Sequence, residues 1–147
     1  MRRIQLAAEL NLPVSAVWEL FADIENYPRY VKFMRSVELK GKPGLGTIWY
    51  DWTTILFLPM KIRHQVVKFE KEEEIAFEVS SPLGGMMWQV FRMAGDQKKA
   101  KVEGEISFDL GNFLLDFFLG FFLKLRLNDM LRSTLSKIRK ETDGRDN

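Results

Sequence analysis

Apolar and polar residues alternate along two segments of this chain, Arg3–Leu10 and Lys99–Phe108. Strict alternation is the pattern of a β-strand that buries one face and exposes the other. Both segments are therefore predicted to be strands that border a hydrophobic core. Between them, hydrophobic runs separated by turn residues such as Gly41–Gly46 predict further strands. These lie at about residues 37–39, 47–56, 60–69, 75–79 and 86–93, with a break at Pro59 before the third of them.

Two other segments have helical spacing. Apolar residues recur every three or four positions over Val14–Ala22, after Pro13, which suits a first helical turn, and a further helical turn is predicted over Tyr27–Met34. The segment Phe113–Leu127 is apolar nearly all round, so a helix there must be covered on most faces. If the helix continues to Lys140, it is about 40 Å long. Its later part is amphipathic, with Leu127, Met130, Leu131, Leu135 and Ile138 inside and Arg132, Lys137 and Arg139 outside.

These elements predict an α+β fold. An antiparallel sheet of about six to seven strands would curve around the long C-terminal helix, with short helices after the first strand. The length of 147 residues and the hydrophobic content of 46% suit one domain over residues 1–147 with a substantial core. The space between sheet and helix would then be an apolar cavity.

Composition excludes several functions. The chain has no cysteine, which rules out disulfides, thiolate zinc sites and cysteine nucleophiles. The net charge of +2 gives no footprint for nucleic acid. Residues 113–127 are too few to cross a bilayer and include three charged residues, and the N-terminus lacks a signal-peptide pattern. We therefore expect a cytoplasmic protein, with peripheral membrane contact as an alternative.

The order of elements and several motifs resemble the START-like (SRPBCC) superfamily, specifically its polyketide cyclase/dehydrase and Coq10-like branch. The matching motifs are Val17–Trp18, Asp23, Tyr27–Pro28, the glycine turn at Gly44 and Gly46, and Trp88. The resemblance covers almost the whole chain. It implies a helix-grip fold and a tunnel for lipids, quinones, polyketides or other apolar ligands. The Coq10-like branch usually ends with Phe-x-x-Arg-Ala on the last helix, and residues 131–134 of this chain depart from that pattern.

Catalytic candidates are few. His64 is the only histidine and alternates with Ile62 and Val66, so it is either a group in the pocket or a structural histidine. Asp51 lies between Trp49 and Trp52; a solvent-facing position is favoured, because burial would demand a partner such as Arg63. Spacings typical of metal sites or of a serine nucleophile are missing, so we predict no metal and no cofactor.

The ligand-binding residues are predicted to be the aromatic and apolar residues of the central strands and of the C-terminal helix, together with the two polar candidates. Whether the aromatic residues line an open cavity or fill the core is left open by the sequence. The predicted set is Trp49, Asp51, Trp52, His64, Trp88, Val90, Phe91, Phe117, Phe121 and Leu125.

The favoured function is binding, transport or presentation of a small hydrophobic ligand, because binding needs only a cavity and a few polar anchors. A cyclase- or dehydratase-type enzyme acting on an apolar or aromatic substrate is the first alternative. A protein-interaction adaptor that uses the apolar C-terminal helix is the second. The segment Phe113–Leu127 predicts a further contact, either a homodimer interface or peripheral docking on a membrane, unless loops of the same molecule cover it.

Overall fold

The computed structural model describes residues 2–31, 34–55, 58–80, 84–109, 129 and 132–140. In this part of the chain, seven strands form one antiparallel sheet in the order β1-β7-β6-β5-β4-β3-β2. Strands β2 to β7 pair with one another in the order of the chain, and β1 pairs with β7 to form the other edge of the sheet. The strands are β1 (Arg2–Leu10), β2 (Met34–Glu38), β3 (Ile48–Ile55), β4 (Leu58–Glu70), β5 (Glu74–Ser80), β6 (Met86–Gly95) and β7 (Ala100–Asp109).

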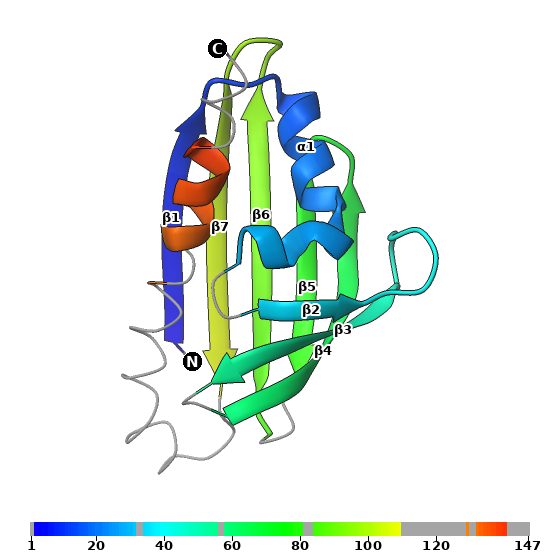
Figure 1. Cartoon of the computed structure of the whole chain (residues 1–147). Coiled ribbons are helices and arrows are strands. Elements are labelled where there is room, and N and C mark those ends of the chain that lie inside the picture. Colours follow the sequence, from blue (N-terminus) through cyan, green and yellow to red (C-terminus); the bar gives the residue numbers. More distant parts are fainter. Residues whose placement is uncertain are drawn as a thin grey trace.

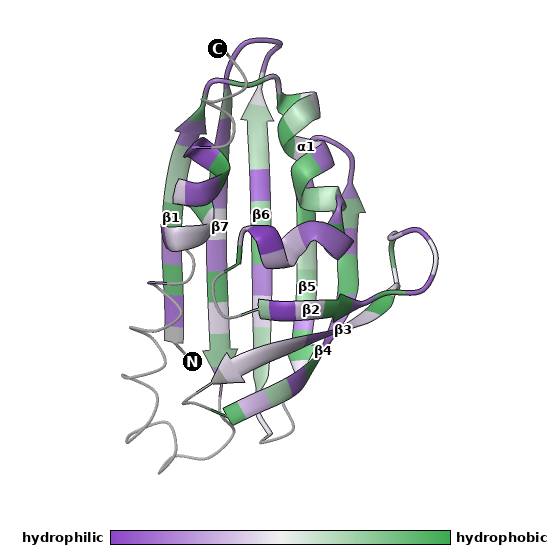
Figure 2. Ribbon diagram, viewed as in Figure 1, coloured by the Kyte–Doolittle hydropathy of each residue, from purple (hydrophilic) through white to green (hydrophobic). Residues whose placement is uncertain are grey.

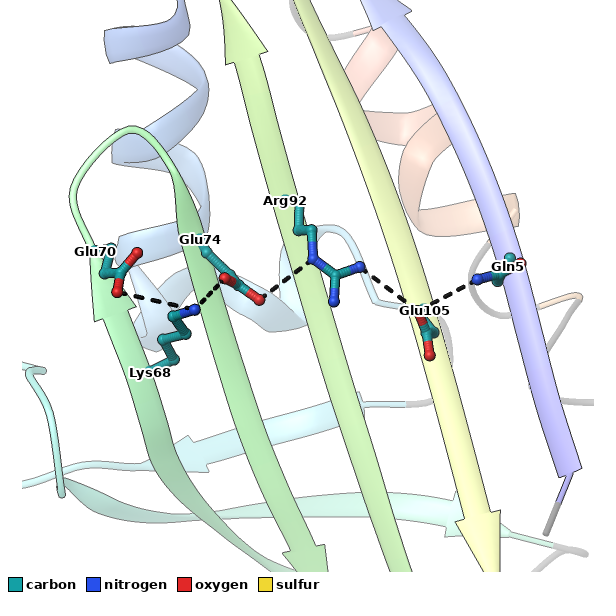
Figure 3. Close-up of polar contacts among 6 residues, drawn as sticks. All are labelled: Gln5, Lys68, Glu70, Glu74, Arg92 and Glu105. Carbon is teal, nitrogen blue, oxygen red and sulfur yellow. Dashed lines mark hydrogen bonds and ion pairs between the residues drawn. The ribbon is translucent and has the colours of Figure 1, made fainter.

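Helices cover one face of this sheet. Helix α1 (Val14–Ala22) and the short 3-10 helix η1 (Ile24–Arg29) follow β1, and residues 132–140 form a further helical segment. All three lie on the same side of the sheet, in front of it in Figure 1 and behind it in Figure 3. The sheet is strongly twisted, so that β2 and β3 run across the direction of β6 and β7 (Figure 1). We call the helix-covered side the interior face.

The core lies between the interior face and the helices. Alternate residues of β1 and β7 point inward, and Figure 2 shows the matching alternation of apolar and polar residues along β1. From α1, Val17, Trp18 and Phe21 are buried against the sheet, and Trp18 packs edge-on against Phe69 of β4 with ring centroids 4.9 Å apart. Helix α1 is thus held by its apolar stripe, as its spacing predicts.

Several boundaries differ from the sequence prediction. The helical turn expected over residues 27–34 is instead η1, which ends at Arg29, and Met34 already belongs to β2. Strand β4 begins at Leu58 and includes Pro59, which pairs with Thr54 rather than breaking the strand. Proline is tolerated there because it lies at the start of the strand.

The predicted C-terminal helix is confirmed where the structure describes it. Residues 132–140 are helical, with Leu135 and Ile138 buried and Arg132, Lys137 and Arg139 exposed, as the amphipathic pattern predicts. The all-round apolar segment Phe113–Leu127, with its predicted dimer or membrane contact, lies outside the described residues. No helix in the described part of the chain is long and apolar enough to span a membrane.

Charged residues form a chain of contacts on the opposite, outer face (Figure 3). The Lys68 Nζ atom lies 2.7 Å from Glu74 Oε2, the Arg92 guanidinium lies 3.4 Å from Glu74 and 3.5 Å from Glu105, and Gln5 donates to Glu105 at 3.3 Å. The hydrogen bond to Glu74 raises the pKa of Lys68. Because exposed ion pairs contribute little to stability, this network mainly keeps the outer face of these strands polar.

The turn between β6 and β7 positions the start of α1. The carbonyl oxygen of Asp96 accepts a hydrogen bond from the backbone N–H of Val14 at 3.0 Å. The Asp96 side chain accepts bonds from the backbone N–H groups of Lys98 and Lys99, which lower its pKa. A Cβ atom at Gly95 would lie 2.2 Å from the Lys99 carbonyl oxygen, so only glycine fits this turn.

Candidate functional site

A buried polar pair lies on the interior face of β3 and β4. The register pairs Trp49 with His64 and Asp51 with Ile62, which places Trp49, Asp51 and His64 on one face. The His64 Nε2 atom and the Asp51 Oδ2 atom form a hydrogen bond, and each residue is only 3% exposed. The predicted solvent-facing position of Asp51 is therefore wrong, and its partner is His64 rather than Arg63.

Three aromatic rings surround this pair. The Trp49 ring stacks on the His64 ring, with centroids 3.8 Å apart and planes 9° from parallel. Phe77 of β5 meets both rings edge-on, at 5.6 Å from Trp49 and 6.3 Å from His64. Tyr27 of η1 closes the group, edge-on to Trp49 at 5.7 Å. We call these five residues the Asp51–His64 cluster: Tyr27, Trp49, Asp51, His64 and Phe77.

Two members of the cluster, Tyr27 and Phe77, were not among the predicted site residues, and Tyr27 is the one of them with a polar group. Its hydroxyl donates a hydrogen bond to the backbone carbonyl of Phe21, at the end of α1. Burial raises the pKa of Tyr27 well above its ordinary value, and the charge of Asp23 raises it further. The phenol therefore stays neutral near pH 7 and fixes η1 to α1. The Tyr27–Pro28 motif, which belongs to the family resemblance, is the signal in the sequence that marks this residue.

Three polar atoms of the cluster are buried and have no hydrogen-bond partner among the described residues. They are Trp49 Nε1, Asp51 Oδ1 and His64 Nδ1. An indole N–H only donates, a carboxylate oxygen accepts, and an imidazole nitrogen does either, depending on its protonation. A buried polar atom left unpaired costs about 1–3 kcal/mol, so proteins rarely keep three in contact without a purpose.

The geometry suits both anchoring and proton transfer. With Nε2 bound to Asp51, the imidazole of His64 is held in one orientation, and its Nδ1 atom is buried with no hydrogen-bond partner among the described residues. An aspartate that orients a histidine in this way is a common element of general-base sites. The cluster therefore offers polar anchors inside an aromatic environment.

The other predicted site residues fall into three groups. Phe91 is on the interior face, 5.0 Å from the ring of Phe21. Because β6 alternates without a bulge, Trp88 and Val90 lie on the outer face with Arg92, so they are not brought to the cluster. Trp52 also points outward, and its indole N–H bonds to Glu38 at 3.3 Å. Phe117, Phe121 and Leu125 lie outside the described residues.

The described residues hold no group of three or more His, Cys, Asp or Glu side chains with the geometry of a metal site. The Asp51–His64 pair supplies two such groups, and its neighbours are aromatic. The site chemistry thus depends on the imidazole, the carboxylate and the indole N–H.

The model of a family described as polyketide cyclase/dehydrase and lipid transport matches residues 1–142. The chain belongs to this family. No curated protein matches the chain. The resemblance inferred from the sequence motifs is thus confirmed at the level of the family, whereas membership of the Coq10-like branch stays a prediction.

Several solved structures share this fold at low sequence identity. The Zhui aromatase/cyclase of a Streptomyces species superposes with a TM-score of 0.80 at 14% identity, covering 99% of this chain and 96% of that chain. A START superfamily protein from Mycobacterium smegmatis gives 0.79 at 10% identity, covering 97% of each chain. A norcoclaurine synthase variant from Thalictrum flavum, in complex with a transition-state analogue, gives 0.72 at 11% identity, covering 95% and 94%. These similarities establish the α+β helix-grip fold.

Proposed function

We propose that this protein binds a small hydrophobic ligand, such as a lipid, a quinone or a polyketide-like compound, on the interior face of its sheet. The observation that carries the proposal is the Asp51–His64 cluster, in which three buried polar atoms have no hydrogen-bond partner among the described residues and lie inside an aromatic environment. A family that joins cyclases, dehydrases and lipid transport is consistent with a shared apolar ligand site. The protein would carry or present the bound ligand, and this function requires no chemical reaction of the ligand.

The cluster also limits which polar groups that ligand can carry. Trp49 Nε1 needs an acceptor and Asp51 Oδ1 needs a donor, whatever the protonation of His64. A ligand that carries both a carbonyl and a hydroxyl group meets both needs, and ordered water can complete what the ligand leaves unpaired. The apolar body of the ligand then contacts the aromatic rings, which supplies most of the affinity.

Tryptophan fluorescence tests whether the interior face binds ligands. Titration with an environment-sensitive apolar probe such as 1-anilinonaphthalene-8-sulfonate is expected to quench tryptophan emission saturably, because Trp49 lies in the cluster. The variant Trp49→Phe should lose most of this quenching. The matched control Trp52→Phe, on the outer face, should keep it.

Native mass spectrometry of the protein purified from its source identifies the ligand itself. A co-purifying apolar compound would support the proposal. If the natively folded protein carries no ligand and shows no saturable probe binding, or if Trp52→Phe rather than Trp49→Phe removes the quenching, the interior site is not the binding site.

A cyclase- or dehydratase-type enzyme is the second candidate, favoured by the way Asp51 orients His64. If the protein turns over a ligand found in this way, His64→Gln is expected to lower kcat by about 100-fold or more, since general-base catalysis contributes about 10²–10⁴. Ligand affinity should change only a few-fold. Equal losses in affinity and rate would instead identify His64 as an anchor, and the enzyme candidate would be abandoned.

A further inference from the structure

The outer face of β3 carries apolar and aromatic side chains that are not buried by the described structure. Ile48 is 44% exposed and Trp52 is 38% exposed, and Tyr50 lies between them on the same face. Leu45, in the loop that leads into β3, is 73% exposed. Contiguous exposed apolar residues on a protein surface usually mark a site of contact with another molecule or a membrane.

Two cations of β4 lie beside this row. Lys61 of β4 lies over the Tyr50 ring, 4.8 Å from its centroid, and Arg63 pairs with Tyr50 across the two strands. Lys40 and Lys42 are exposed in the segment that joins β2 to β3. Among the described residues, neither these two lysines nor Arg63 forms an ion pair. We call this region the basic aromatic surface, consisting of Lys40, Lys42, Leu45, Ile48, Tyr50, Trp52 and Lys61.

The carboxylate at this surface is already engaged. Glu38 accepts from Lys61 at 3.0 Å and from the Trp52 indole N–H at 3.3 Å. It neutralises Lys61 and fixes the Trp52 ring along the strand, but leaves Lys40, Lys42 and Arg63 uncompensated. The surface differs in this respect from the part of the outer face in Figure 3, where Lys68 and Arg92 are balanced by Glu70, Glu74 and Glu105.

We propose that the basic aromatic surface is a docking site for anionic lipid membranes. Lysine and arginine side chains attract acidic headgroups, and tryptophan and tyrosine prefer the boundary between headgroups and hydrocarbon. The exposed aliphatic groups of Ile48 and Leu45 favour a membrane over a nucleic acid, because they gain by entering hydrocarbon and offer nothing to phosphates or base edges. The surface lies on the face opposite the ligand cluster, so docking leaves the cluster unobstructed.

Hydrogen bonds hold the turn that carries Leu45 in one conformation, so this turn does not have to become ordered when the surface docks. The Gly46 N–H donates to the Val66 carbonyl at 2.8 Å, the Val66 N–H donates to Thr47 at 2.9 Å, and the Gly44 N–H donates to the Thr47 hydroxyl at 3.0 Å. Leu45 is therefore presented at a fixed turn. Presenting an apolar side chain on an ordered turn avoids the entropy cost of ordering it at the membrane.

Vesicle co-sedimentation tests the proposal. The protein is expected to bind vesicles of 70% phosphatidylcholine and 30% phosphatidylserine, to bind pure phosphatidylcholine much more weakly, and to be released by 0.5 M NaCl. The double variant Lys40→Glu/Lys42→Glu should lower the vesicle affinity by about 30-fold or more, from roughly 1 kcal/mol per lysine. The matched control Lys98→Glu/Lys99→Glu makes the same charge change at the β6–β7 turn and should retain most of the binding.

A second pair of variants separates the apolar contribution from net charge. Leu45→Ser/Ile48→Ser leaves the charge unchanged and should lower the vesicle affinity about tenfold or more, because two aliphatic groups no longer enter the bilayer. Both positions are exposed, so the fold is retained. Binding to a 20-base-pair DNA duplex is measured in parallel.

Four outcomes overturn the proposal: no binding to acidic vesicles, equal losses in the Lys40/Lys42 and Lys98/Lys99 variants, full binding by Leu45→Ser/Ile48→Ser, or tight binding of DNA in place of vesicles. Loss of vesicle binding in Lys40→Glu/Lys42→Glu, with probe quenching unchanged, would support membrane docking separately from ligand binding.

Discussion

Replacing Asp51 alone by valine, or His64 alone by leucine, is expected to lower the free energy of unfolding by about 3–5 kcal/mol. Each change leaves the other member of the pair buried without its hydrogen-bond partner, and both side chains are 3% exposed, so water cannot easily compensate. Urea denaturation monitored by tryptophan fluorescence measures the change, provided that the m-value stays constant.

The double variant Asp51→Val/His64→Leu gives the sharper result. Replacing a buried polar pair by apolar residues of similar volume is often neutral or stabilising, so the double variant should be far more stable than the sum of the single changes predicts. A coupling free energy of about 2 kcal/mol or more is expected. If the single variants change the free energy of unfolding by nearly zero and their effects are additive, the burial and pairing of these two residues would be contradicted.

The same single and double variants also distinguish a role in stability from a role in ligand binding. If the cluster is retained for ligand binding, the double variant should fold stably and yet lose probe binding. A pair kept only for folding would instead give a double variant that is less stable than the wild-type protein. Polar groups whose removal stabilises a protein are characteristic of functional sites, where selection acts on activity rather than on stability.

The sequence predicts the elements whose pattern is unambiguous. Strands β1 and β7 alternate cleanly, and helix α1 has an apolar stripe bounded by Pro13 and Asp23, so their location and their buried faces follow from periodicity alone. The sequence of β6 shows no alternation of apolar and polar residues, because Met86–Phe91 is apolar at every position but one. The predicted binding set included Trp88 and Val90 together with Phe91, although strand alternation places them on opposite faces, and the structure puts Phe91 on the interior face.

The Asp51–His64 pair depended on strand register. Placing the hairpin break at Pro59 shifts the pairing of β3 with β4 by several residues, whereas the structure starts β4 at Leu58 and pairs Trp49 with His64. A change of register moves a side chain to a different neighbour or to the other face, so the contact between these two residues could not be predicted without the register. The outward position of Trp52 follows from the sequence once Trp49 is known to face inward, because residues three apart along a strand lie on opposite faces.

Phe77→Ala is expected to lower the free energy of unfolding by about 3–5 kcal/mol, with Phe77→Leu costing about 1–2 kcal/mol. Phe77 is 1% exposed and meets Trp49, His64 and Tyr27 edge-on, so removing its ring opens a void beside all three. Because the rings of Trp49 and His64 are held by this contact, near-ultraviolet circular dichroism should also change in Phe77→Ala and stay close to wild type in Phe77→Leu.

The Phe77 variants also test whether the cluster must be rigid to bind ligand. If aromatic packing positions the imidazole and the indole N–H, then Phe77→Ala should weaken ligand binding even under conditions in which it remains fully folded, whereas Phe77→Leu should weaken it less. Unchanged binding in folded Phe77→Ala would mean that β3 and β4 alone position these groups. A stability loss below about 1 kcal/mol would show that neighbouring side chains collapse into the void, contrary to the close packing on this face.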